Sequence, residues 1–192
     1  MSPLVKCFEQ LIHPDWKLPR DGSLWILTEP KNQNKQDKNY QIELIGGPSF
    51  AFSLDQPGTD PWPFIMKAED MKGMRKVCDA LIVMQRDEQN YVIALEMKSN
   101  NEGKAERQIA SSHLLINWLI DLLKLHNHWN GKWKFCGVIS FTPRNQERKG
   151  ATAKKTPVPK PSLSHWGYPV YRLHNHKRLD LVDLINSVDK AV

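Results

Sequence analysis

The feature that most constrains the fold is a pair of apolar segments, residues 77–85 and 90–99, separated by a short charged stretch. Both segments are rich in Val, Ile and Leu, and the four residues between them read Arg-Asp-Glu-Gln. Apolar runs of this length on either side of a polar turn are typical of a buried β-hairpin. The sequence therefore predicts two antiparallel strands joined by a four-residue loop, residues 86–89.

Three charged residues interrupt this apolar hairpin: Asp79, Glu96 and Lys98. The four-residue loop would pair Gln85 with Asn90. In that register Asp79 lies directly opposite Glu96, where Cβ atoms are roughly 5 Å apart and like charges are destabilising. Lys98 shares a face with Glu96, because side chains alternate along a strand. The pattern predicts two carboxylates and one ammonium at one point of the sheet, whereas a one-residue slip would separate them.

Two interpretations of this cluster are open. It could be a salt-bridged group on a solvent-facing sheet, but its neighbours on the same face are apolar: Leu81, Val83, Val92 and Ala94. Two carboxylates facing each other on a covered face must share a proton or a cation. Hard oxygen ligands of this kind suit Mg²⁺ or Mn²⁺. The pattern favours a metal site at Asp79 and Glu96.

In these residues the chain resembles the PD-(D/E)xK nuclease superfamily. The matching residues are Asp79, the tripeptide Glu96-Met97-Lys98 and Ser99. Two residues match more loosely: Glu9, on an expected first helix, and Gln108, near the start of the helix expected after the hairpin. Cys78 stands where the family often has proline. The resemblance covers residues 77–118; beyond them it is an order of elements.

The resemblance implies a restriction-endonuclease-like α/β fold, a mixed central β-sheet flanked by helices. It also implies a metal-dependent nuclease that hydrolyses phosphodiester bonds, in DNA rather than RNA. The catalytic residues it implies are Asp79, Glu96, Lys98, Gln108 and Glu9. Mg²⁺ or Mn²⁺ would be held by Asp79, Glu96 and the Met97 carbonyl, with Lys98 acting on the attacking water or the phosphate. Glu69, nearer to Asp79 in sequence, is the alternative to Glu9 as the extra acid.

Two other classes of function stay open. One is a catalytically silent nucleic-acid-binding or scaffold subunit on the same fold, against which the intact Asp79, Glu96 and Lys98 argue. The other is a small metal-dependent phosphohydrolase. A basic segment described next fits a polymeric substrate better than a small one.

The basic segment, residues 142–161, contains four prolines and six basic residues against one glutamate. Such a composition does not build a packed core, so a flexible segment is expected. Its basic charge predicts a clamp on nucleic-acid phosphates, with salt-dependent binding; the alternative is a solubilising loop. The residues predicted to contact nucleic acid are Arg144, Arg148, Lys149, Lys154 and Lys155.

The remaining elements follow from periodicity and turn residues. Helices are expected at residues 4–12, 104–124 and 179–188. Strands are expected at residues 23–28, 40–45, 50–54, 133–141 and 168–174, with the strand at 133–141 parallel to the second hairpin strand. The sequence His-Asn-His occurs at residues 126–128 and 174–176, at element boundaries, and its histidines are expected on the surface.

Composition places the chain among single-domain globular proteins. Its 192 residues suffice for one core, and its net charge of +6 favours a polyanionic partner. No apolar run approaches the length of a membrane-spanning helix, and the first residues lack the layout of a secretory signal. The three cysteines, Cys7, Cys78 and Cys136, are expected as core thiols in a reducing cytoplasm. A homodimer or a larger complex stays open.

Overall fold

The structure is a computed structural model and describes residues 2–28, 41–55, 73–98, 102–141, 158–174 and 176–189. Within these residues the protein is a mixed α/β structure with two β-sheets and three α-helices. The helices are α1 (Pro3–Leu11), α2 (Glu102–Leu125) and α3 (Leu181–Asp189). The expected α/β class and the three expected helices are confirmed.

The larger sheet has six strands in the order β4-β5-β6-β7-β9-β8. Its strands are β4 (Ser49–Phe52), β5 (Ala80–Arg86), β6 (Gln89–Lys98), β7 (Trp133–Phe141), β8 (Ser162–Leu163) and β9 (Pro169–His174). β4, β5 and β6 are antiparallel neighbours, whereas β6, β7 and β9 are parallel. The parallel pairing of β7 with β6, predicted from the intervening helix, is confirmed.

The hairpin of β5 and β6 has the predicted register, with Gln85 paired to Asn90. Its connection is shorter than predicted, because Arg86 and Gln89 also pair and leave only Asp87 and Glu88 in the turn. Both turn residues have positive φ angles, 45° and 67°. Two successive positive φ values define the tight turn whose twist matches that of the flanking strands. The register is unchanged because the two extra residues extend the ladder symmetrically.

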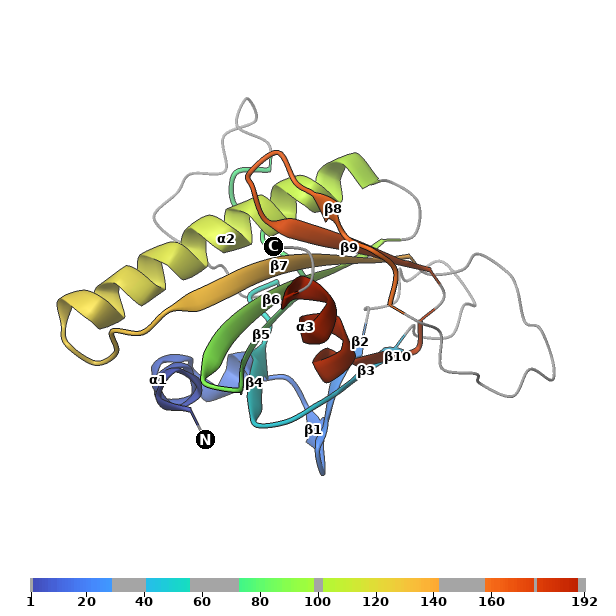
Figure 1. Cartoon of the computed structure of the whole chain (residues 1–192). Helices are drawn as coiled ribbons and strands as arrows, with labels where there is room; N and C mark the ends of the chain where they lie inside the picture. The colour runs from blue at the N-terminus through green and yellow to red at the C-terminus, as the bar shows by residue number, and fades with distance from the viewer. Residues whose placement is uncertain are drawn as a thin grey trace.

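Helices α1 and α2 pack on one face of the six-stranded sheet, and α3 lies against the other (Figure 1). Phe8 of α1 stacks on Phe52 of β4, with ring centroids 6.0 Å apart. Ile109 of α2 lies so close to Gly137 of β7 that a Cβ atom at residue 137 would be 2.9 Å from Ile109 Cγ2. The absence of a side chain at residue 137 therefore permits the close approach of α2 to the sheet.

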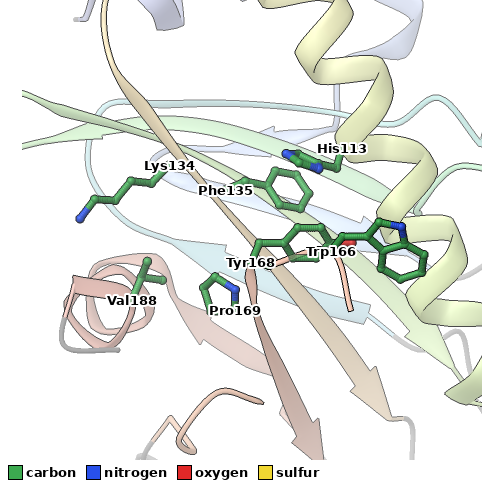
Figure 2. Close-up of a pocket in the computed structure, with 8 residues that line it drawn as sticks. His113, Lys134, Phe135, Trp166, Tyr168, Pro169 and Val188 are labelled. Carbon is green, nitrogen blue, oxygen red and sulfur yellow. The ribbon is translucent and has the colours of Figure 1, made fainter. Parts of the chain in front are cut away.

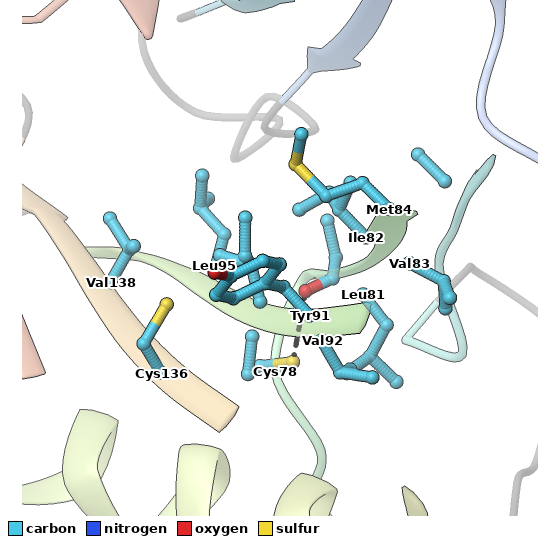
Figure 3. Packing of buried hydrophobic residues seen from close by; sticks show 14 of the residues in the cluster. Cys78, Leu81, Ile82, Val83, Met84, Tyr91, Val92, Leu95, Cys136 and Val138 are labelled. Atoms are coloured by element: carbon cyan, nitrogen blue, oxygen red, sulfur yellow. Dashed lines mark hydrogen bonds between the residues drawn. The ribbon is translucent and has the colours of Figure 1, made fainter. Parts of the chain in front are cut away.

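The core is centred on β5 and β6, whose side chains fill both sides of the sheet (Figure 3). Leu81 and Val92 point to the side of α2, and Met84, Tyr91 and Leu95 point to the other. All five are at most 3% exposed, so the hairpin is covered on both faces. The predicted core position is confirmed for the free thiols Cys78 and Cys136, whereas the free thiol Cys7 is only half-buried.

A second, four-stranded sheet was not predicted. Its order is β1-β2-β3-β10, formed by β1 (Arg20–Asp21), β2 (Leu24–Thr28), β3 (Gln41–Ile45) and β10 (Arg178–Asp180). The strands at β2 and β3 match the predicted segments, but their partner β10 comes from the far end of the chain and leads directly into α3. The expectation of one central sheet is therefore corrected to two. Among the described residues, no helix combines the length and the apolar character needed to cross a membrane.

Candidate active site

Asp79 and Glu96 lie opposite each other, as the register predicts. The ladder of β5 and β6 continues to the pair Ala80–Leu95, so the next two residues face each other. The Asp79 backbone N–H donates a 3.2 Å hydrogen bond to Glu96 Oε2. In the reverse direction, the Met97 backbone N–H donates a 2.5 Å hydrogen bond to Asp79 Oδ2. Each carboxylate is thus held by the backbone of the opposing strand.

Glu96 is the most deeply buried charged residue of this group. Its residue exposure is 0%, whereas Asp79 is half-buried. The pKa of the Glu96 carboxyl is raised from 4.5 to about 8, chiefly by burial and also by the adjacent Asp79 charge, against the lowering effect of Lys98. The pair therefore holds a proton near neutral pH when no cation balances its charge.

Lys98 joins this pair from the same face of β6. Its ammonium group forms an ion pair with Glu96 Oε1. The ammonium also donates a 2.8 Å hydrogen bond to Gln108 Oε1 on α2. Gln108 Nε2 donates a 3.0 Å hydrogen bond to the Val77 carbonyl, so both ends of this buried amide are engaged. The structure thus brings Asp79, Glu96, Lys98 and Gln108 together.

Ser112 is a further residue of the site that the sequence analysis did not assign. Its hydroxyl donates a 2.9 Å hydrogen bond to the Gln108 carbonyl and accepts one of 2.8 Å from the Cys78 backbone N–H. These bonds tie the segment before β5 to α2, one residue before Asp79. The signal in the sequence is its position four residues after Gln108, on the same face of the helix.

Of the two candidates for an extra acid, Glu9 and Glu69, only Glu9 lies within the described residues. The Glu9 side chain is exposed on α1 and makes no hydrogen bond or ion pair within the described part of the chain. Its backbone carbonyl accepts a 3.1 Å hydrogen bond from Lys17 Nζ. Glu69 lies outside the described residues. Among the described residues, the carboxylate cluster therefore consists of Asp79 and Glu96.

The donor set at this pair fits a hard divalent cation of the Mg²⁺ or Mn²⁺ type. Met97 directs its N–H toward Asp79, and the N–H and C=O of one strand residue point to the same side. The Met97 carbonyl therefore faces the edge that carries the Asp79 carboxylate. Two carboxylates and a carbonyl are oxygen ligands, and Mg²⁺ keeps several waters in addition. No group of three or more His, Cys, Asp or Glu side chains converges within the described ranges.

The sheet edge beside Lys98 carries more functional groups than the sequence analysis predicted. The parallel register places Arg172 of β9 on the same face as Glu96, two strands away. Arg172 Nη2 forms an ion pair of 2.5 Å with Glu106 of α2. His174, at the end of β9, stacks on Phe141, at the end of β7. Parallel pairing across two crossovers cannot be read from spacing along the chain, which is why these residues were missed.

The basic residues predicted to contact nucleic acid all lie outside the described residues: Arg144, Arg148, Lys149, Lys154 and Lys155. They follow Phe141 in the sequence, so the basic segment is attached to the strand end at this edge of the sheet. On α2, Lys104 and Arg107 are exposed close to Gln108. The predicted roles of the five basic residues remain predictions.

A shallow pocket of about 260 Å³ lies away from the carboxylate pair, where β9 begins. Figure 2 shows the rings of Phe135, Tyr168 and Trp166 gathered near His113, with Lys134 and Val188 farther out. Burial lowers the pKa of His113. None of the residues that line the pocket belongs to the candidate site.

The histidines of the two His-Asn-His sequences were predicted to lie on the surface. This is confirmed for His126, His128 and His174, whereas His176 is buried.

The comparisons with known proteins leave the site to be judged by its geometry. No family model, no curated protein and no solved structure matches the chain.

Proposed function

We propose that the protein is a metal-dependent nuclease that hydrolyses phosphodiester bonds in DNA. The observation that carries the proposal is the arrangement of Asp79, Glu96 and Lys98 at the carboxyl end of β6, with Gln108 beside them. This arrangement has the residue types and spacing of the PD-(D/E)xK superfamily. The surrounding order of elements supports it: a helix, an antiparallel three-stranded unit, a helix and a parallel strand.

Asp79, Glu96 and the Met97 carbonyl would hold Mg²⁺ or Mn²⁺. When bound, such an ion lowers the pKa of a coordinated water and offsets charge that builds up on the phosphate. As a ligand Glu96 would be ionised, and its buried negative charge would attract the cation strongly. The backbone N–H groups of Asp79 and Met97 keep both carboxylates oriented.

Lys98 would act directly on the reacting groups. Its ammonium is already held between Glu96 and Gln108, so it is positioned before substrate arrives. There the ammonium would donate a hydrogen bond to the attacking water or to a phosphate oxygen. A preorganised donor of this kind stabilises developing negative charge without a reorganisation cost. Gln108 is a positioning residue, fixed in turn by the Val77 carbonyl.

The proposal is tested by incubating the purified protein with plasmid, linear duplex DNA, single-stranded DNA and RNA, each in Mg²⁺, Mn²⁺ or EDTA. We expect cleavage of DNA with either metal and none in EDTA. The matched control is Asp79→Asn, which keeps an oxygen acceptor for the Met97 N–H but removes the charge. Metal-independent cleavage, or equal cleavage by Asp79→Asn, would contradict the proposal. Tight binding of DNA without cleavage under any condition would instead favour the catalytically silent subunit.

A further inference from the structure

Two aromatic rings share the sheet edge that carries Lys98. The register pairs Lys98 with Phe141 and Phe141 with His174, so the three side chains lie on one face at the ends of β6, β7 and β9. Neighbouring strands are roughly 5 Å apart, which places the His174 backbone roughly 10 Å from that of Lys98. The rings are therefore within one nucleotide's reach of a phosphate bound at Lys98.

The Phe141 and His174 rings are stacked on each other. Their centroids are 4.7 Å apart and their planes differ by 14°. Phe141 is half-buried and packs against the core, whereas His174 is exposed. β8 pairs with β9 only at Pro169 and Val170, so within the described residues the side of β9 away from β7 has no strand partner at His174. The inner ring is anchored and the outer ring presents a flat surface to solvent.

An exposed, supported ring of this kind is the surface on which proteins stack the bases of single-stranded nucleic acid. A base in a duplex is already stacked between its neighbours and has no free face to offer. Charge alone does not explain the arrangement, because the nearby cation Arg172 is engaged by Glu106 and by Ser162 Oγ. The chemistry of this edge therefore combines a phosphate-directed ammonium with a base-directed ring.

We infer that Phe141 and His174 form a stacking platform for one unpaired nucleobase of the strand that lies at Lys98. The substrate is then single-stranded or locally unpaired nucleic acid. This inference rests on the proposed function, since it places a nucleic-acid phosphate at Lys98. It goes further by naming the structural state of the substrate and the residues that select it.

The test compares two single strands of equal length and backbone charge, one with its bases and one built of abasic residues, together with a fully paired, blunt-ended duplex. Binding is measured by fluorescence anisotropy in EDTA, so that no cleavage occurs. We expect His174→Ala to weaken binding of the base-bearing strand roughly tenfold, the scale of one lost base–aromatic stack. Binding of the abasic strand and of the duplex should not change. His174→Tyr, which restores a flat ring, should recover the affinity.

The matched control is Trp118→Ala, which removes an exposed aromatic residue from α2, ten positions and roughly 15 Å along the helix from Gln108. It should bind all three probes as the wild type does. Equal binding of base-bearing and abasic strands by the wild type would overturn the stacking platform while leaving the proposed nuclease intact. A loss with His174→Ala on both strands would also overturn it. If the wild type binds none of the probes, both proposals fail. If it prefers the base-bearing strand but never cleaves with metal, the platform stands and the nuclease proposal fails.

Discussion

The Lys98 ammonium donates a 2.8 Å hydrogen bond to Gln108 Oε1, and Nε2 of the same side chain donates in turn to the Val77 carbonyl. One amide thereby joins three segments: the end of β6, helix α2 and the residues before β5. The orientation of that amide is determined by its two partners, since the oxygen must accept and the nitrogen must donate.

Replacing Gln108 with Met should therefore lower kcat roughly tenfold with KM within twofold of the wild type. The methionine fills a similar volume but gives Lys98 no acceptor and leaves the Val77 carbonyl without its donor. An unpaired buried carbonyl should also cost roughly 1–2 kcal/mol of stability. Steady-state cleavage assays and urea unfolding measure the two effects. Gln10→Met, an exposed glutamine on α1, is the control and should change neither. A KM effect without a kcat effect would place Gln108 in substrate binding instead.

Replacing Lys98 with Met should reduce cleavage roughly a hundredfold or more, the scale of losing one electrostatic contact in the transition state. The variant should still fold, bind DNA and bind metal, because the aliphatic stem is kept and Glu96 loses a competitor for the cation. The control is Lys134→Met. It removes a lysine of β7, in the same sheet, that forms an ion pair with Asp189 of α3. Wild-type cleavage by a well-folded Lys98→Met protein would remove Lys98 from the mechanism.

Millimolar Mg²⁺ or Mn²⁺ should raise the melting temperature, since a ligand that binds only the folded state stabilises it by about 2.7 kcal/mol at a hundred times its Kd. For a domain of this size that corresponds to a shift of roughly 5 °C or more. Asp79→Asn should reduce the shift, and Asp121→Asn, at an exposed position on α2, should not. Differential scanning calorimetry measures it. A flat response of the wild type would count against a metal at the carboxylate pair.

The metal-free protein should lose stability as the pH rises from about 4.5 to about 8, the window set by Glu96. In the unfolded chain this carboxyl releases its proton near 4.5, whereas in the folded protein its pKa is about 8. Between these values the folded state binds more protons, so the free energy of unfolding falls with pH, by roughly one to several kcal/mol. Urea unfolding in EDTA at both ends of the window measures the fall.

The same experiment on Glu96→Gln should show a much smaller fall, because the amide does not titrate. Glu88→Gln, in the exposed hairpin turn, should behave as the wild type. Equal falls in the wild type and in Glu96→Gln would mean that other groups control the pH dependence and that Glu96 is ionised throughout.

Alanine at Arg148, Lys149, Lys154 and Lys155 should weaken DNA binding without regard to sequence and flatten its dependence on salt. Each phosphate contact that is lost removes about one released counterion from the slope. The melting temperature should change little, because the composition of this segment is not that of a core. Anisotropy titrations at several salt concentrations measure the slope, and an unchanged slope would assign the segment to solubility.

The hairpin was predictable because its information is local. Side chains alternate along each strand, and a symmetric turn preserves the sum of paired residue numbers, so Asp79 opposes Glu96 whether two or four residues form the connection. The length of that connection was wrong because Asp87 and Glu88 adopt positive φ without the glycine or asparagine that usually signals it. Gln108 was within reach for a similar reason, since it lies early in a helix that starts near the end of β6.

The remainder depended on contacts between distant segments. The second sheet is closed by β10, which pairs with β3 from more than a hundred residues away. The position of His174 relative to Lys98 depends on two parallel registers in succession, that of β6 with β7 and that of β7 with β9. The local strand propensity of a segment does not specify which distant segment it pairs with, or in which register.

Gly137 has no side chain, yet it helps to determine the position of the side chains at the carboxylate pair. Ile109, which packs on it, is the neighbour of Gln108, so this close approach of α2 to the sheet is one residue from the amide that holds Lys98. The position of the Gln108 amide relative to Lys98 thus depends on the absence of a side chain at Gly137. If the protein acts as proposed, a larger residue at position 137 would displace α2, and with it Gln108 and the Lys98 ammonium, without altering any residue that contacts the substrate.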